Sequence, residues 1–213
     1  VFIQQRQRRI DKVTTKFERA EALRSMQAWH DAGVFVLPAY KGNNNDKKKF
    51  PIGDPKNSYR YAHWRDGEVE PPPIEDRIDK IRKGHSDGIC VLCGPCSKGL
   101  ESLEVEGFVD AEIIAELVMN IEEAGLGEVW ERIEAGVVDR TPSGGLHWYF
   151  FVDGENKGNT PLAYPEPGHE KSSKAMIETR GRGGLMVSSH SGGQTHPNGG
   201  VCLLYTSPSP RDA

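Results

Sequence analysis

Two glutamates, Glu104 and Glu106, lie two residues apart in the segment SLEVEG (102–107). Because successive side chains of a strand point to opposite faces, these two carboxylates would share one face, with Leu103 and Val105 on the other. Two like charges this close raise each other's pKa unless a cation lies between them. The pair therefore belongs either to a solvated strand face or to a metal site, and the two cannot be separated from these residues alone.

A histidine follows a glycine turn in TPSGGLHWYF (141–150). Ser143 lies in the predicted turn, and His147 lies on the strand that leaves it, on the same face as Tyr149 and Phe151. A lone strand histidine is usually a structural group, but a glycine turn also lets a phosphate or nucleotide approach the backbone closely. His147 and Ser143 are therefore candidates for nucleotide contact.

A third cluster lies in IETRGRGG (177–184), where Glu178 and Arg180 share a strand face and Arg182 follows among glycines. The cluster is either a plain ion pair or a functional set, in which the carboxylate ligates a metal and the arginines bind phosphates. Oxygen ligands of this kind suit Mg²⁺ or Mn²⁺ rather than Zn²⁺. Two such cations bridged by carboxylates are what in-line attack on a nucleotide α-phosphate needs.

The cysteines have a spacing that resembles part of a metal site. Cys90, Cys93 and Cys96 form C-x2-C-x2-C, and the fourth cysteine is Cys202. However, Cys90 and Cys93 lie three apart on a predicted strand and should face opposite sides. We therefore expect small buried or turn residues and no cysteine metal site.

Length and charge limit the class of protein. A chain of 213 residues with net charge −4 can bury one full core. It has neither a signal-peptide pattern nor an apolar run long enough to span a bilayer, so we expect a soluble intracellular protein. Residues 1–60 are basic and residues 61–140 acidic, and Lys47, Lys48 and Lys49 form a run that either binds nucleic-acid phosphates or is merely solvated.

Hydrophobic periodicity and turn residues predict interleaved helices and strands. Helices are expected over 14–32, from the prolines at 71–73 to about 84, over 110–124 and over 127–135; strands over 34–37, 88–94, 100–106, 137–141, 146–152, 175–180 and 184–189. A polar connection is expected over 153–174. Because adjacent strands are also joined directly, the pattern favours a mixed α/β or α+β domain.

The chain divides into three predicted parts: a basic N-terminal extension (1–13), a catalytic domain (14–200) and a tail (201–213). The tail, VCLLYTSPSPRDA, can be back-translated to a sequence that resembles a transposase-based sequencing adapter read in frame. We therefore leave it out of the predicted fold, the alternative being a genuine flexible Ser/Pro tail.

The clusters also resemble a known family. In order and spacing, LEVEG (103–107), TPSGGLHWYF (141–150) and IETRGRGGLMVSSHSGG (177–193) are similar to the three motifs of the bifunctional DNA primase/polymerase (prim-pol) domain of the archaeo-eukaryotic primase superfamily. AGVFVLPAYKG and SDGICVLCGPCSKGLESLEVEG resemble its upstream strands. The resemblance covers roughly residues 20–200.

The resemblance implies a primase-like core, in which a sheet like that of RNA-recognition motifs packs on helices. It further implies that Glu104, Glu106 and Glu178 ligate two divalent cations, Mg²⁺ or Mn²⁺, and that His147 contacts the phosphates of the incoming nucleotide. Arg180 and Arg182 lie where the family has basic residues near the nucleotide. Glutamates replace the more usual aspartates at the metal positions, which lengthens each ligand by one methylene.

The function expected from this resemblance is template-directed primase/polymerase activity in the replication of phage, plasmid or mobile DNA. The expected location is then the cytoplasm of a bacterial or phage-infected cell. Its partners would be nucleoside triphosphates, a single-stranded DNA template or primer held partly by the lysine run 47–49, and a fused or separate helicase. Two other functions stay open: a single-stranded DNA-binding replication module without catalysis, and a metal-dependent nuclease that uses the same carboxylates.

Overall fold

The computed structural model describes residues 18–39, 73–192, 195 and 200–206. The predicted N-terminal extension (1–13) and the lysine run 47–49 lie outside the described residues. The described helices are α2 (Arg19–Asp31), α4 (Ile74–Arg82), α5 (Ala111–Glu123) and α6 (Gly127–Glu134), with a 3-10 turn η3 (Pro95–Ser97). The described strands are β1 (Val36–Pro38), β2 (Ile89–Leu92), β3 (Leu100–Val105), β4 (Val137–Arg140), β5 (Leu146–Phe151), β6 (Thr160–Ala163), β7 (Ile177–Arg180), β8 (Leu185–Val187) and β9 (Leu203–Thr206).

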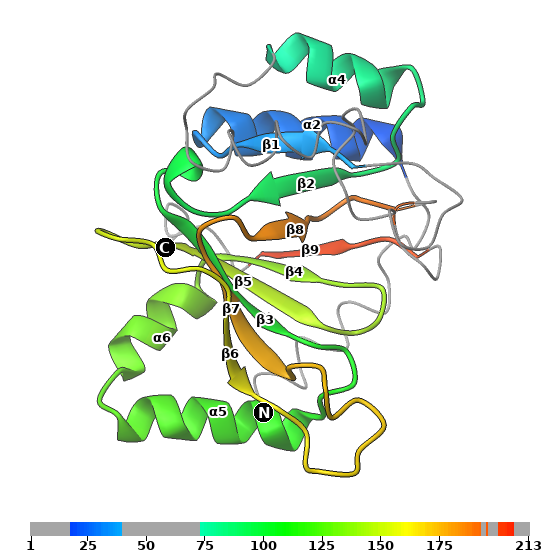
Figure 1. Cartoon of the computed structure of the whole chain (residues 1–213). Helices are drawn as coiled ribbons and strands as arrows, with labels where there is room; N and C mark the ends of the chain where they lie inside the picture. Colours follow the sequence, from blue (N-terminus) through cyan, green and yellow to red (C-terminus); the bar gives the residue numbers. More distant parts are fainter. Residues whose placement is uncertain (1–17, 40–72, 193–194, 196–199, 207–213) are drawn as a thin grey trace.

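The strands form two antiparallel sheets. The larger has the order β6-β7-β3-β5-β4-β9, and the smaller has the order β1-β2-β8. Figure 1 shows the small sheet stacked above the large one, with α2 and α4 beside the small sheet and α5 and α6 at the other side of the molecule. This segregation of helices around antiparallel sheets confirms the α+β class that the sequence predicts.

One face of the large sheet is covered by α5 and α6. An apolar stripe of α5, which includes Ile113 and Leu117, packs with Trp130 of α6 against Leu103 and Trp148 of the sheet. Asp110 caps α5 by accepting hydrogen bonds from the backbone N–H groups of residues 112 and 113 at 3.1 and 3.0 Å. Leu103 and Val105 therefore face the helices, which leaves Glu104 on the opposite face.

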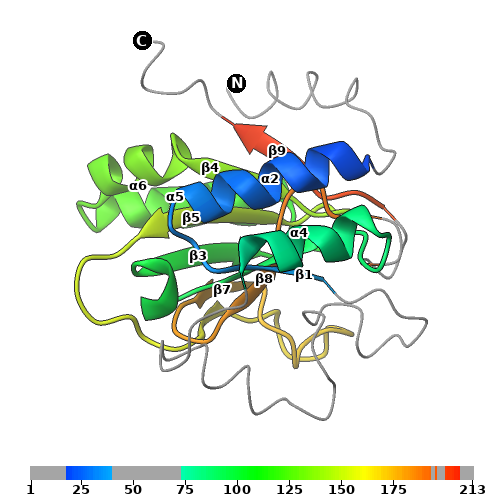
Figure 2. The ribbon, with the colours of Figure 1, turned by 90° about the horizontal axis from the view of Figure 1, so that it is seen from above.

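The opposite face of the large sheet packs partly against the small sheet and α2. Trp29 of α2 meets Tyr149 of β5 edge-on at 5.1 Å, and Met186 of β8 joins the same core as Leu100 of β3. Figure 2 shows α2 and α4 lying side by side across the strands. This second core covers only part of the face, so a cleft remains between the two sheets near Glu104.

Two strands lie where the sequence analysis placed none. Strand β6 forms within the expected connection 153–174, at the edge of the sheet, where Pro161 is tolerated because an edge strand has one unpaired side. Strand β9 lies within the tail that we left out of the predicted fold. It pairs with β4, and Cys202 just before it is fully buried. Residues 202–206 therefore belong to the fold, and our exclusion of them was wrong. The adapter-like origin of the tail stays a prediction.

Within the described part of the chain, no helix is both long and apolar enough to cross a membrane.

Candidate metal centre

The three predicted carboxylates converge at the middle of the large sheet. Glu104 of β3 lies directly opposite Glu178 of β7 on one side and His147 of β5 on the other. Glu106 follows β3 and points the same way. One carboxylate oxygen from each of Glu104, Glu106 and Glu178 lies within 4.8 Å of the other two. Antiparallel pairing of the three motif strands therefore brings together residues that are distant in the chain.

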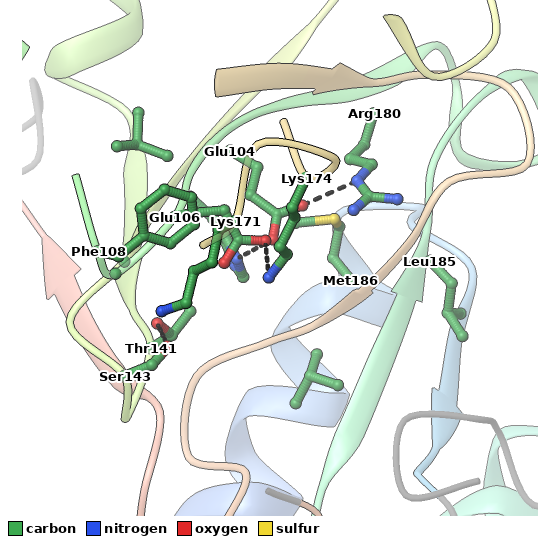
Figure 3. Close-up of a pocket in the computed structure, with 15 residues that line it drawn as sticks. Glu104, Glu106, Phe108, Thr141, Ser143, Lys171, Lys174, Arg180, Leu185 and Met186 are labelled. Atoms are coloured by element: carbon green, nitrogen blue, oxygen red, sulfur yellow. Dashed lines mark hydrogen bonds and ion pairs between the residues drawn. The ribbon is translucent and has the colours of Figure 1, made fainter. Parts of the chain in front are cut away.

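Basic side chains neutralise this cluster. Arg180 Nε donates to Glu104 Oε2 at 2.8 Å, and Arg180 Nη2 donates to Glu178 Oε1 at 2.5 Å. Lys174 Nζ lies 2.6 Å from Glu106 Oε1. Figure 3 shows Lys174 and Arg180 reaching the carboxylates from different segments of chain. Each carboxylate thus has a cationic partner in this conformation.

Glu104 is held in its charged form. Its side chain is 12 % exposed, and the Nε2 atom of His147 lies 3.7 Å from its Oε1. Burial alone would raise the pKa of Glu104, but His147 and Arg180 together outweigh burial and lower this pKa to about 2. Glu104 is therefore a carboxylate at any physiological pH.

Glu178 shows the opposite shift. Burial raises its pKa, Arg180 opposes that rise, and the charges of Glu104 and Glu106 add to it. At Glu178, burial together with the two neighbouring carboxylates thus outweighs Arg180 and Lys174. A divalent cation would stabilise the charged form of Glu178, so the local electrostatics favour cation binding.

The donor set fits a small, hard divalent cation. All three ligands are carboxylate oxygens, which Mg²⁺ and Mn²⁺ prefer. Oxygens on one Mg²⁺ lie about 3 to 4 Å apart, given metal–oxygen distances of about 2.1 Å. The observed spread of up to 4.8 Å is close to this range, and the flexible glutamate side chains can close the difference by rotation.

Glu104 and Glu106 line a cleft of about 620 Å³ between the two sheets, and Glu178, which meets them beside it, is not among the described residues that line it. Its walls come from the end of β3, the turn before β5, the segment 171–174, Arg180 and residues 185–187 of β8. Phe108 stands at one side, and Lys171 Nζ lies 4.8 Å from the centre of its ring. The volume lies within the range of pockets that hold a small ligand.

Glycines let two turns of the site touch. A Cβ on Gly107, which follows Glu106, would overlap the backbone carbonyl oxygen of Ser143. A Cβ on Gly145 would lie 2.6 Å from the carbonyl oxygen of Val105. The turn after β3 and the turn before β5 are therefore in backbone contact, which fixes Glu106 relative to the strand that carries His147.

The other predicted residues fall inside and outside the cleft. Ser143 is exposed and lines the cleft, with its hydroxyl 3.0 Å from that of Thr141. Arg182 is exposed on the turn between β7 and β8 and is not among the described residues that line the cleft.

The predicted placement of Cys90 and Cys93 is confirmed. Cys90 and Cys93 are fully buried and belong to different core clusters, so they do face opposite sides of β2. Burial raises the pKa of the Cys93 thiol well above its usual value. The one group of three or more potential ligands close enough to share a metal, among the described residues, is the glutamate cluster.

Three residues that line the cleft were not predicted from the sequence. Phe108, Lys171 and Lys174 line the cleft, the two lysines from the stretch expected to be a mere connection. A lysine in a polar loop has no periodicity that would distinguish it from a solvated one. Their position after β6 brings the loop back over the cleft, and β6 was itself not predicted.

Comparison with known proteins assigns no family: no protein-family model and no curated protein matches this chain. The resemblance to prim-pol domains therefore stays a prediction based on three motifs. The fold and the geometry of the glutamate cluster are the features from which a function can be inferred.

Proposed function

We propose that this chain is a divalent-cation-dependent nucleotidyltransferase, a template-directed DNA primase/polymerase module of the prim-pol type. The observation that carries the proposal is the convergence of Glu104, Glu106 and Glu178 within 4.8 Å, where Glu104 and Glu106 line a cleft bordered by basic side chains. Carboxylate triads of this kind hold the cations that assist in-line phosphoryl transfer.

The cationic side chains favour a triphosphate as the ligand. Lys171, Lys174 and Arg180 all line the cleft, together with His147. A nucleoside triphosphate carries several negative charges, which such side chains can bind once the carboxylates are shared with metal cations. A nuclease acting on a single phosphodiester has less need of so many cations, which favours the transferase over the nuclease.

Each residue then has a role. Glu104, Glu106 and Glu178 would hold one or two Mg²⁺ or Mn²⁺ ions, which when bound supply charge neutralisation at the α-phosphate and activation of the primer hydroxyl. Arg180 and Lys174 would neutralise the phosphates that the cations do not reach. His147, held beside Glu104, would contact the triphosphate and orient it for attack.

The architecture is compatible with a primase-like core. The motif strands β3, β5 and β7 are adjacent and antiparallel, and α5 and α6 cover one face of their sheet. Glu178, Glu104 and His147 lie on the other face. The proposed partners are nucleoside triphosphates and a single-stranded template with its primer, and a helicase on the same or another chain would supply that template.

Primer extension tests the proposal. A labelled primer on a single-stranded template is incubated with nucleoside triphosphates and Mg²⁺ or Mn²⁺, using wild type, Glu106→Ala and Glu123→Ala. Glu123 is exposed on α5 and serves as the matched control. We expect extension by wild type and Glu123→Ala, and a loss of at least about hundredfold in Glu106→Ala, because a metal ligand is removed.

The same assay separates the alternatives. Shortening of the labelled strand without triphosphates would indicate the nuclease and overturn the proposal. Binding of the strand without any incorporation, unchanged in Glu104→Ala, would indicate the inactive binding module. Equal extension by wild type and Glu106→Ala would show that the site is elsewhere.

A further inference from the structure

The row of polar side chains continues beyond His147. Along the sheet, Glu178 of β7, Glu104 of β3, His147 of β5 and Asp139 of β4 are successive directly opposed pairs. Directly opposed residues point to the same face of a sheet, so Asp139 lies beside His147 on the side away from Glu104. Asp139 is completely buried, a costly position for a carboxylate without a specific partner.

One oxygen of Asp139 has a full set of donors. Oδ2 accepts hydrogen bonds from the Tyr149 hydroxyl at 3.1 Å, the Ser188 hydroxyl at 2.8 Å and the Ser189 backbone N–H at 2.9 Å. Ser188 in turn accepts from Trp29 Nε1 at 2.9 Å. These bonds tie β4 to the end of β8 and to α2. They satisfy the hydrogen-bonding capacity of Oδ2, but none of them involves Oδ1.

Two buried atoms at this place have no hydrogen-bond partner among the described residues: Oδ1 of Asp139 and Nδ1 of His147. His147 is 5 % exposed, and its other ring nitrogen, Nε2, is the one near Glu104. A buried polar atom without a partner costs about 1–3 kcal/mol. Since the two atoms belong to directly opposed residues and one can be a donor while the other is an acceptor, a hydrogen bond between them would satisfy both.

We propose that Asp139 is a positioning residue, whose Oδ1 accepts a hydrogen bond from Nδ1–H of His147 and thereby holds the ring with Nε2 directed at the cleft. The role of a histidine nitrogen is set by the hydrogen bond that the other nitrogen makes. With Nδ1–H donating to Asp139, Nε2–H is the donor presented to a phosphate oxygen, so this role needs a proton on both ring nitrogens. This inference rests on the proposed function only in assigning a phosphate contact to His147.

Asp139→Asn tests the proposal because the donors to Oδ2 determine the orientation of the asparagine amide group. Its amide oxygen has to replace Oδ2, since three donors point there, so its NH₂ group would face His147. That NH₂ can only donate, and Nδ1 would have to become the acceptor. The substitution therefore reverses the hydrogen bond at Nδ1 and leaves the ring with a proton on Nε2 alone.

Long-range ¹H–¹⁵N NMR shows which ring nitrogens of His147 carry a proton, and this measurement does not depend on enzymatic activity. The signal that is missing in His147→Gln belongs to His147. We expect a protonated Nδ1 in wild type and a protonated Nε2 with bare Nδ1 in Asp139→Asn. Ser188→Ala removes one donor to Oδ2 but leaves Oδ1, so the wild-type pattern should persist. A bare Nδ1 in wild type would overturn the proposal, even if Asp139→Asn fails to fold.

A double-mutant cycle supplies the kinetic readout. Asp139→Asn should reduce primer extension about tenfold to hundredfold, as loss of a supporting hydrogen bond at a functional side chain does. In a His147→Ala background the same substitution should cause almost no further loss. If the two losses multiply, Asp139 acts through the fold alone and the proposal is wrong. A wild-type chain without incorporation would refute the proposed function, while the NMR result would still decide the pairing.

Discussion

Glu104 contacts more of the site's functional groups than one strand position would suggest. It is opposed by Glu178 and His147, and it accepts a hydrogen bond from Arg180. Alternation assigned each carboxylate only a strand face, and the resemblance of the three motifs implied that they share cations; the structure confirms that the three carboxylates converge. Their basic partner Lys174 and the buried Asp139 could not be predicted, since neither has a spacing that reveals which residue it meets.

The low pKa of Glu104 predicts an acid-dependent loss of stability in chelated, metal-free protein. A folded-state pKa of about 2 against a usual 4.5 stabilises the fold above pH 4.5, and this stabilisation is lost as the pH falls toward 2. Between pH 6 and pH 3 the loss from this group should be about 2 kcal/mol. Urea unfolding of wild type and Glu104→Gln measures it.

The difference in the free energy of unfolding between wild type and Glu104→Gln should therefore shrink on acidification. Glu123→Gln, changed at an exposed site on α5, should follow wild type at both pH values. If wild type and Glu104→Gln lose stability in parallel, Glu104 is not held in its charged form by His147 and Arg180.

Lys174 predicts opposite effects on the two ligands. It lies 2.6 Å from Glu106 Oε1 and therefore competes with a cation for that carboxylate. Lys174→Met should tighten Mn²⁺ binding about fivefold, equivalent to about 1 kcal/mol, and should raise the KM for the nucleotide because a phosphate contact is lost. Calorimetric Mn²⁺ titration and steady-state extension give the two quantities.

Lys80→Met, changed at an exposed site on α4, is the matched control for Lys174→Met and should alter neither quantity. Weaker Mn²⁺ binding in Lys174→Met would mean that the lysine supports the carboxylates rather than competing for them.

At the scale of elements, the site depends on the contact between the turn after β3 and the turn before β5. Gly107→Ala places a methyl group against the carbonyl oxygen of Ser143, and relief requires the backbone to move. We expect a loss of about 1–3 kcal/mol in the free energy of unfolding, with weaker Mn²⁺ binding because Glu106 is the preceding residue. Denaturant melts and Mn²⁺ titration test both.

Gly158→Ala is the control for Gly107→Ala, because a Cβ at Gly158 meets no atom within 4 Å. It should leave both quantities close to wild type. If Gly107→Ala behaves in the same way, the two turns are not held in contact in solution.

Helices and motif strands were predicted well because they have strong periodicity. The stripe of α5 and the alternation in β3 and β5 are local signals that the tertiary structure then uses. Strand β6 was not predicted because it has four residues with a proline and lies at the edge, where pairing rather than pattern defines a strand. The order of strands in the sheets is likewise set by non-local pairing, which no local pattern contains.

At the scale of the whole molecule, the site lies in the seam between two sheets, so a bound cation should stabilise the whole fold. An ion that binds only the folded chain stabilises it by about 2.7 kcal/mol at a concentration one hundred times its Kd. Mn²⁺ should therefore raise the Tm of wild type and of Glu123→Gln, and should hardly raise that of Glu178→Gln. A similar Tm rise in Glu178→Gln would place the cation elsewhere.

The strand order has a consequence for how the site comes into being. Strand β3 pairs with β5 and β7, both of which are made after it, so Glu104 emerges from the ribosome long before the residues that complete its surroundings. Closing these long loops belongs late in folding, because the chain must first lose the entropy of bringing distant segments together. A cation can therefore do little to start folding. Once the last strand has docked, a bound cation should slow unfolding more than it speeds folding.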